Sequence, residues 1–170
     1  MAETAVVVLF PELEPLIGEL RRRHTDDGAR GMPPHATLIY PFADSARVGD
    51  LLAGIRREVS GFAPFEVRFP ELARFPQTLY LRPEPQGPFI AMNRALELAF
   101  PEFPPYGGEF DETVPHVTIA HGDDALLRAI ECELAPPRLT LRVESAWLVE
   151  DTLAGWRRHT PFALNRHTLL

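Results

Sequence analysis

The alternation of apolar and polar residues along the chain predicts a mixture of strands and helices. Short runs of β-branched or alternating residues favour strands, because successive side chains of a strand point to opposite faces. Strands are expected at residues 5–10, 35–42, 65–69, 77–82, 115–120, 139–150 and 156–164. Apolar residues spaced three and four apart favour helices, which are expected at residues 13–23, 48–59, 89–100 and 123–134.

Segments rich in Gly, Pro and Asp separate these elements and predict loops or turns, at residues 25–34, 70–76, 101–113 and 151–155. Ser45 is expected to cap the second helix. The element order predicts an α+β chain. In both halves a strand is followed by a helix and then by a pair of strands, so we expect residues 1–170 to form a single domain of two lobes related by a pseudo-twofold axis.

Length and composition fit a globular protein that folds without disulfides. The chain has 170 residues, of which 45% are hydrophobic and 24% charged. Cys132 is the single cysteine, so no disulfide within the chain can form, and we expect its side chain to be at least half-buried. The first residues do not resemble a signal peptide, and no apolar run approaches the roughly 20 residues that a membrane helix needs. We therefore expect a cytoplasmic protein without membrane contact, and a monomer.

The charge balance limits the kind of partner. With 17 basic and 24 acidic residues the net charge is −7. Long nucleic acids bind to basic surfaces that neutralise their phosphates, so this chain is poorly suited to them. A small phosphate-binding site remains compatible with an acidic protein, because a few groups can create a local positive potential.

Two segments repeat the same pattern of residues, 81 positions apart. Residues 34–38 read Pro-His-Ala-Thr-Leu, and residues 115–119 read Pro-His-Val-Thr-Ile. In a strand the His and Thr of each segment share one face, while the residue between them faces apolar packing. If the two strands lie side by side in a cleft, two imidazoles and two hydroxyls converge there.

This group of side chains suits phosphodiester hydrolysis. The reaction needs a base for the nucleophile and an acid for the leaving oxygen, and imidazole serves in both roles near neutral pH. His35 and His116 are therefore the candidate acid–base pair. Thr37 and Thr118 would donate hydrogen bonds to the phosphate oxygens. This chemistry requires no metal and no cofactor.

A single His-x-Thr triplet is weak evidence, since both residues are common in strands. The duplication, with the same preceding Pro and the same following aliphatic residue, makes the functional interpretation much stronger. The alternative of a zinc site from His35, His116 and His121 lacks the close ligand spacing and the Cys or carboxylate partner that zinc sites usually show.

The paired segments resemble the motifs of the two-histidine phosphoesterase superfamily, and within it the 2′-5′ RNA ligase-like family. The resemblance extends over nearly the whole chain, through residues 35–42, 78–83, 115–120, 147–156 and 162–164. It implies a bilobal α+β fold, with two antiparallel sheets around a central cleft and helices outside. It also implies hydrolysis or transfer at 2′,3′-cyclic or 2′-5′ phosphodiester linkages of small nucleotides or RNA ends.

The sequence departs from this family at one position. Some relatives carry a basic residue, often Arg, five positions after the second motif His, where this chain has His121; Tyr40 stands at the equivalent position after His35. His121 could contact phosphate when it is protonated. Strict alternation would put it on the face opposite His116, so a bulge or a strand end would be needed.

Other residues are weaker candidates. Tyr40 and Phe75, and also Tyr80, could stack on a nucleobase, although aromatic residues in strands are more often part of the core. Arg74 and Arg82 flank the expected cleft and could contact phosphate. The arginine run 21–23 is expected to form a solvated face.

Three functions remain open at this point. The first is a metal-independent phosphodiesterase acting on 2′,3′-cyclic or 2′-5′ linkages. The second is a module of the same fold that binds a nucleotide or RNA end without turnover. The third is 2′-5′ RNA ligation, which the acidic charge of the chain disfavours.

Overall fold

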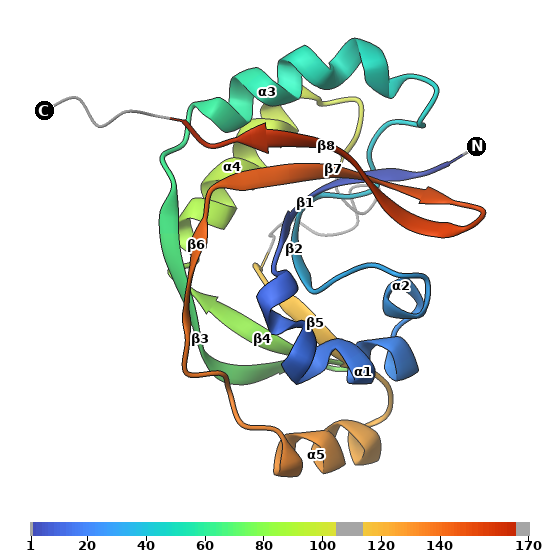
Figure 1. Ribbon diagram of the computed structural model, residues 1–170, viewed down its shortest axis with the longest axis vertical. Helices are drawn as coiled ribbons and strands as arrows, with labels where there is room; N and C mark the ends of the chain where they lie inside the picture. Colours follow the sequence, from blue (N-terminus) through green and yellow to red (C-terminus); the bar gives the residue numbers. More distant parts are fainter. Residues whose placement is uncertain (1, 105–113, 166–170) are drawn as a thin grey trace, which may run out of the picture.

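The computed structural model describes residues 2–104 and 114–165, and in this part of the chain eight strands form one curled antiparallel sheet (Figure 1). The strands are β1 (Thr4–Leu9), β2 (His35–Ile39), β3 (Phe65–Phe75), β4 (Thr78–Glu84), β5 (Val117–His121), β6 (Thr140–Val143), β7 (Ser145–Thr152) and β8 (Gly155–Ala163). Their order across the sheet is β6-β3-β4-β5-β2-β1-β7-β8.

The helices lie in two groups. Helices α3 (Leu52–Ser60) and α4 (Gly87–Ala99) pack together at one end of the molecule. Helices α1 (Glu14–His24), α2 (Asp26–Ala29) and α5 (Asp124–Glu133) lie toward the other end (Figure 1). Short 3₁₀ helices at Pro11–Leu13 and Val48–Leu51 lead into α1 and α3. Among the described residues, no helix is both long and apolar enough to cross a membrane.

The expected mixed α+β fold is confirmed, but the two expected sheets are halves of a single sheet. One half contains β6, β3, β4 and β5, and the other contains β2, β1, β7 and β8. In the described chain the halves join where β2 pairs with β5, at the single position Ala36–Val117. These are the middle residues of the two His-x-Thr segments, so the junction of the sheet brings the two motifs side by side.

The two halves of the sheet are not the two halves of the sequence. Strands β3 and β4 come from the first half of the chain but lie next to β5, while β7 and β8 come from the second half and lie next to β1. Each half of the sheet therefore combines strands from both ends of the sequence. This exchange means that neither motif can be placed without residues from the far part of the chain.

The central strand β1 is buried on both faces, which explains its continuous apolar run. Val6 and Val8 belong to the main hydrophobic core. Ala5 and Val7 point to the opposite face, where they form a smaller apolar cluster with Met32, Val149 and the partly buried rings of Tyr40, Trp147 and Trp156. The second face of the sheet is thus also apolar close to the motifs.

Several element boundaries differ from those that the sequence predicts. Most of the expected turn at residues 70–76 belongs to β3, which ends at Phe75 and accommodates Pro70 at an irregularity of the β3–β4 pairing, where the missing N–H of Pro is tolerated. The expected strand 139–150 is divided at Glu144, because β6 pairs with β3 at one end of the sheet and β7 pairs with β1 near the other.

Other differences concern helix ends and exposure. The expected loop 25–34 contains α2, capped by the hydroxyl of Thr25. Ser45 does not cap the second helix, because a 3₁₀ turn from Val48 precedes α3 and its capping position is occupied by Arg47. Cys132 is exposed on α5 rather than buried. Most of the expected loop 101–113 falls outside the described residues.

Candidate active site

A cavity of about 330 Å³ lies where the two motifs meet, and we call it the central cavity. Both members of each motif line it, together with residues from β1, from α2 and its following loop, and from β8. Its lining residues are Ala5, Val7, Asp26, Asp27, Met32, His35, Thr37, Tyr40, His116, Thr118, His121 and Trp156. The structure therefore brings together both candidate histidines and both candidate threonines.

Each motif strand contains one extra residue at the same place. In β2, Thr37 and Ile39 face the consecutive β1 residues Val7 and Val6, which leaves Leu38 as the extra residue. In β5, Thr118 and Ala120 face Tyr80 and Leu79, which leaves Ile119. Leu38 and Ile119 are both three residues after the motif histidine, and a bulge of this kind shifts the alternation of the strand by one residue.

The two bulges give both motif strands the same six-residue pattern. The first, third and sixth residues line the central cavity: His35, Thr37 and Tyr40 in one strand and His116, Thr118 and His121 in the other. The second, fourth and fifth residues are in the main core: Ala36, Leu38 and Ile39, and Val117, Ile119 and Ala120. The bulge that His121 would need is thus present, and Tyr40 occupies the matching position in the other strand.

A bulge leaves backbone groups without their usual partner in the sheet, and these need other hydrogen bonds when they are buried. In β2, the buried side chain of Asn93 on α4 donates to the carbonyl oxygen of Leu38 over 2.5 Å. In β5, the buried Arg21 on α1 donates through Nη1 to the carbonyl oxygen of Thr118 over 2.7 Å. Each bulge is therefore held by a buried polar side chain from a helix.

The two imidazoles are oriented in the same way. The Nδ1 atom of His35 lies 2.8 Å from the carbonyl oxygen of Pro33, and that of His116 lies 2.7 Å from the carbonyl oxygen of Val114. Because a carbonyl oxygen only accepts, Nδ1 must carry the proton in both rings. The neutral rings consequently keep an unprotonated Nε2, which is the nitrogen able to take a proton.

Burial keeps both rings neutral at neutral pH. Burial foremost, and then the nearby positive charge of Arg21, lower the pKa of His35 to about 4, against the opposite effects of Asp27 and the Pro33 carbonyl. Burial also lowers the pKa of His116, which the Val114 carbonyl partly offsets. The two groups are thus in the form that can accept a proton.

The surroundings of the two histidines differ in character. The ring of His116 makes edge contacts with Phe75 and Tyr80, at centroid distances of 5.2 and 5.6 Å, and these two aromatic rings stack on each other at 4.5 Å. Tyr80 is 3% exposed. The expected stacking of Phe75 on a nucleobase is not supported, because Phe75 supports His116 and does not line the central cavity.

Tyr40 lines the central cavity and belongs to a second aromatic group, separate from that of Phe75 and Tyr80. Its ring lies 6.4 Å from that of Trp156, and its hydroxyl donates to Glu3 over 2.7 Å. Trp156 comes from β8 at the far end of the chain, and its contribution was not foreseen from the sequence. The apolar side chains of Ala5, Val7 and Met32 complete this wall of the cavity.

His121 is the last residue of β5 and the sixth residue of the pattern that begins at His116. It is exposed, and its Nδ1 atom lies 2.9 Å from the hydroxyl oxygen of Thr78 on the neighbouring strand. Among residues 2–104 and 114–165, no three His, Cys, Asp or Glu side chains are grouped so that they could hold a metal ion.

The expectation that the arginine run forms a solvated face is wrong for Arg21, which is 1% exposed. Its guanidinium contacts Asp27, whose other carboxylate oxygen lies 3.6 Å from Nε2 of His35. A signal for this was present in the sequence, since Arg21 continues the helical spacing of the buried Leu13 and Ile17 at steps of four residues.

Arg74 and Arg82 do not reach the central cavity. Arg74 forms ion pairs with Asp124 and Glu131, both on α5, and Arg82 forms one with Glu71. Both side chains are paired with carboxylates on neighbouring elements and lie outside the lining of the central cavity, so the expectation that they contact phosphate is not supported.

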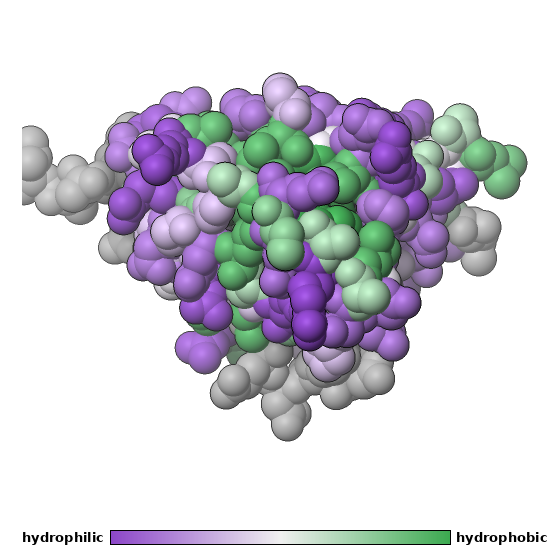
Figure 2. All heavy atoms as spheres, turned by 90° about the horizontal axis from the view of Figure 1, so that it is seen from below, coloured by the Kyte–Doolittle hydropathy of each residue, from purple (hydrophilic) through white to green (hydrophobic). Residues whose placement is uncertain are grey.

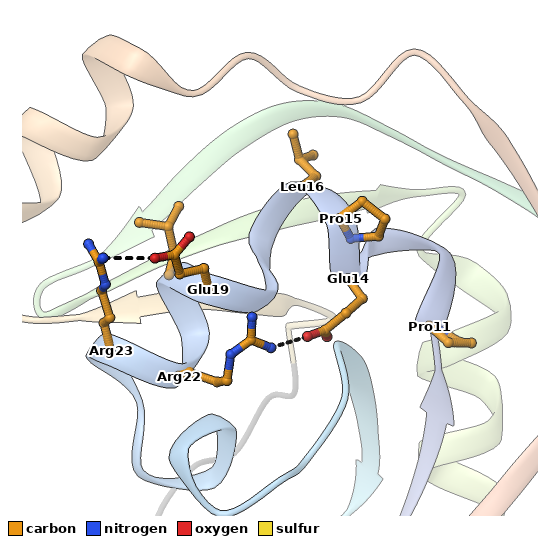
Figure 3. A pocket seen from close by; sticks show the side chains of 8 residues that line it. Pro11, Glu14, Pro15, Leu16, Glu19, Arg22 and Arg23 are labelled. Atoms are coloured by element: carbon orange, nitrogen blue, oxygen red, sulfur yellow. Dashed lines mark hydrogen bonds and ion pairs between the residues drawn. The ribbon is translucent and has the colours of Figure 1, made fainter.

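A larger hollow of about 600 Å³ lies along the outer side of α1 (Figure 3). Its charged residues pair within the helix, Arg22 with Glu14 and Arg23 with Glu19. Its lining contains no His or Thr, and its two glutamates are paired with arginines, so it does not repeat the side chains of the central cavity. Seen from the end of the molecule where α1 and α5 lie, apolar side chains gather at the centre of the face and hydrophilic ones surround them (Figure 2).

Solved structures with the same fold come from proteins of low sequence identity. A structure of Escherichia coli LigT with 3′-AMP matches with a TM-score of 0.67 and 16% identity, covering 96% of this chain and 98% of that one. A protein of Thermus thermophilus matches with a TM-score of 0.65 and 22% identity, covering 97% of this chain and 100% of that one. At these identities the likeness establishes the fold.

Sequence comparison assigns the family. A Geobacillus kaustophilus protein that carries a putative phosphoesterase name is 28% identical in an alignment over 123 residues, with 66% of this chain and 66% of that protein covered. The family model of the 2′-5′ RNA ligase superfamily matches residues 9–154, which include both His-x-Thr segments and all strands from β2 to β7. The chain therefore belongs to the 2′-5′ RNA ligase superfamily.

Proposed function

We propose that this protein is a metal-independent phosphodiesterase that hydrolyses small nucleotides, with 2′,3′-cyclic phosphates as the preferred substrates. The observation that carries the proposal is the convergence of His35, Thr37, His116 and Thr118 on the central cavity. The family and the phosphoesterase name of the Geobacillus relative support the same class of reaction.

The two histidines share the proton transfers. One Nε2 takes a proton from the attacking water, the water oxygen bonds to phosphorus, and the bond from phosphorus to a ribose oxygen breaks. The other imidazole, protonated beside the bound anion, gives its Nε2 proton to that ribose oxygen. The hydrogen bonds from Nδ1 to Pro33 and Val114 fix both rings for these steps.

The phosphate is held by neutral donors and by one titratable group. The hydroxyls of Thr37 and Thr118 donate to the non-bridging oxygens, where negative charge increases in the transition state. His121 adds a positive charge when it is protonated. Because Asp26 and Asp27 also line the central cavity, substrates with many phosphates are disfavoured, in agreement with the net charge of −7.

The side of the central cavity that Tyr40 and Trp156 line binds the nucleobase. Tyr40 and Trp156 provide two ring faces over an apolar floor, and stacking on such rings contributes about 1–3 kcal/mol per base. LigT structures contain 3′-AMP, ATP and NADP+, so nucleotides are ligands of this fold in that protein. Trp156→Ala should raise KM for nucleotide substrates about tenfold or more, with a much smaller change in kcat.

The test offers 2′,3′-cyclic AMP to the pure protein in the presence of EDTA. Hydrolysis should persist, and His35→Ala and His116→Ala should each lower kcat/KM by about 10²- to 10⁴-fold. His159→Ala is the matched control, because His159 is exposed on β8 outside the central cavity. Full activity in either cavity variant would refute the acid–base pair, and tight binding without turnover would identify a binding module instead.

A further inference from the structure

The three consecutive arginines of α1 have different environments. Arg22 and Arg23 are exposed and pair with glutamates of their own helix (Figure 3). Arg21 is 1% exposed, and its Nη atoms make three contacts: Thr118 oxygen at 2.7 Å, Asp27 Oδ1 at 3.2 Å and Met32 oxygen at 3.2 Å. Burying an arginine is costly unless its charge and its N–H groups are paired.

Asp27 links this buried cation to the first motif. Its Oδ1 contacts Arg21 and its Oδ2 lies 3.6 Å from Nε2 of His35, the nitrogen that faces the central cavity. Since Nδ1 of His35 is bonded to the Pro33 carbonyl, the ring is held at one nitrogen and faces a carboxylate at the other. The arrangement runs from the backbone of the second motif through Arg21 and Asp27 to the imidazole of the first.

This connection supplements the weak backbone link between the motifs. In the described chain β2 and β5 pair at one position, Ala36–Val117. A second tie through Arg21 would restrict how His35 and Thr118 move relative to each other, and a misplacement of about 1 Å can cost on the order of 10²-fold in rate. Within the part of the chain that the structure describes, His116 has no comparable carboxylate partner and is surrounded by Phe75 and Tyr80.

We propose that Arg21 and Asp27 are positioning residues for His35, which fix its imidazole relative to the second motif and set the charge that it meets during proton transfer. The expected effect on kcat rests on the proposed phosphodiesterase function. The expected effect on the position of His35 rests on the contacts of Arg21 and Asp27 alone. Asp27 stabilises the imidazolium that forms on His35, and Arg21 neutralises Asp27 while His35 is uncharged.

The charges of Asp27 and Arg21 shift the pKa of His35 in opposite directions. Asp27 raises the pKa of His35 and Arg21 lowers it. Asp27 is itself ionised: burial acts to raise its pKa, but the charges of Arg21 and His35 together with the hydrogen bonds to Thr25 and Gly28 lower it below its ordinary value. The other titratable groups that line the central cavity with His35 and Asp27 are Asp26, Tyr40, His116 and His121.

The test follows the His35 ring by NMR titration in the full-length protein. Asp27→Asn, which nearly preserves shape, should lower the pKa of His35 below its wild-type value, and Arg21→Met should raise it. A purely structural loss would not shift the pKa in opposite directions. Asp26→Asn removes the same charge from the cavity without the contact to His35, so it should shift this pKa less. Shifts of the same sign, or none in Asp27→Asn, would overturn the proposal.

The kinetic arm uses 2′,3′-cyclic AMP. Asp27→Asn should lower kcat about 10- to 100-fold with KM nearly unchanged, and move the acidic limb of the pH profile to lower pH. Arg22→Gln on the outer side of α1 should leave both constants unchanged. An unaltered kcat in Asp27→Asn would refute the positioning role. If the wild type hydrolyses nothing, the proposed function fails, while the titrations still decide whether Arg21 and Asp27 control His35.

Discussion

The side chain of Asn93, on α4, donates a hydrogen bond of 2.5 Å to the carbonyl oxygen of Leu38, the extra residue of the bulge in β2. Asn93 is 4% exposed and Leu38 is 1% exposed, so water cannot replace this bond. A helix distant in sequence thus stabilises the irregularity that turns Tyr40 toward the central cavity.

Replacing Asn93 by Leu should destabilise the protein by about 1–3 kcal/mol, because the buried Leu38 carbonyl loses its partner. Urea unfolding measures this change. Arg94→Gln on the exposed side of the same helix should change the free energy of unfolding by less than about 0.5 kcal/mol. If Asn93→Leu is as stable as the wild type, the bulge does not depend on this hydrogen bond.

The hydroxyls of the two motif threonines should matter more for catalysis than for stability. Thr37→Val and Thr118→Val keep the β-branched shape but remove the donor, and each should lower kcat for 2′,3′-cyclic AMP by about 10²- to 10³-fold. Thr→Ser at the same positions keeps the hydroxyl and should retain most of the activity. Equal losses in the Val and Ser variants would show that the methyl group, not the hydroxyl, is needed.

The low pKa of His35 predicts how stability depends on pH. Unfolded histidine has a pKa near 6.5 and folded His35 a pKa of about 4, so the unfolded state binds the extra proton between these values. This contribution to stability is therefore fully present above about pH 6.5 and is lost as the pH falls toward 4. The loss should reach about 3 kcal/mol.

Urea unfolding at pH 7 and pH 4.5, for the wild type and for His35→Gln, measures this contribution. The variant lacks the titrating group, so its stability should fall less over the same interval. Parallel losses in the two proteins would mean that His35 titrates normally in the folded state.

The hairpin between β7 and β8 depends on a glycine. Gly155 has φ = +117°, and a Cβ atom there would lie 2.4 Å from the carbonyl oxygen of Arg30, which accepts a hydrogen bond from the N–H of Trp156. Gly155→Ala should therefore cost about 1–3 kcal/mol or more, and displace Trp156 from the central cavity. Thermal unfolding would measure the cost.

Gly49→Ala is the control, because a Cβ atom there meets no atom within 4 Å. It should be neutral or slightly stabilising. If the Gly155→Ala protein has the same melting temperature as the wild type, the hairpin can adjust without strain.

The sequence could predict the motif strands because their signals are local. His35, Thr37, His116 and Thr118 stand in β-strand patterns with a Pro before each motif, and the repetition of the pattern 81 positions later indicated that the two segments act as a pair. The bulges were beyond local reasoning, since Leu38 and Ile119 look like ordinary strand residues and become extra residues only against their partner strands.

Arg21 and Trp156 were missed for a related reason. The charge of Arg21 suggests solvent, and its burial depends on Asp27 and on a carbonyl 97 residues away. Trp156 reaches the central cavity because β7 and β8 return to the side of the sheet that contains β1. Contacts between distant segments decided both positions.

The six-residue pattern that the two motif strands share makes the two ends of the central cavity chemically different. The first and third positions of the pattern are His and Thr in both strands, but the sixth position is Tyr40 in one strand and His121 in the other. A change at this position alters one end of the cavity without disturbing the reacting groups. A ligand with an aromatic end and an anionic end would consequently fit in one orientation, so with the proposed cyclic phosphate substrates the two strands would distinguish the two ribose oxygens.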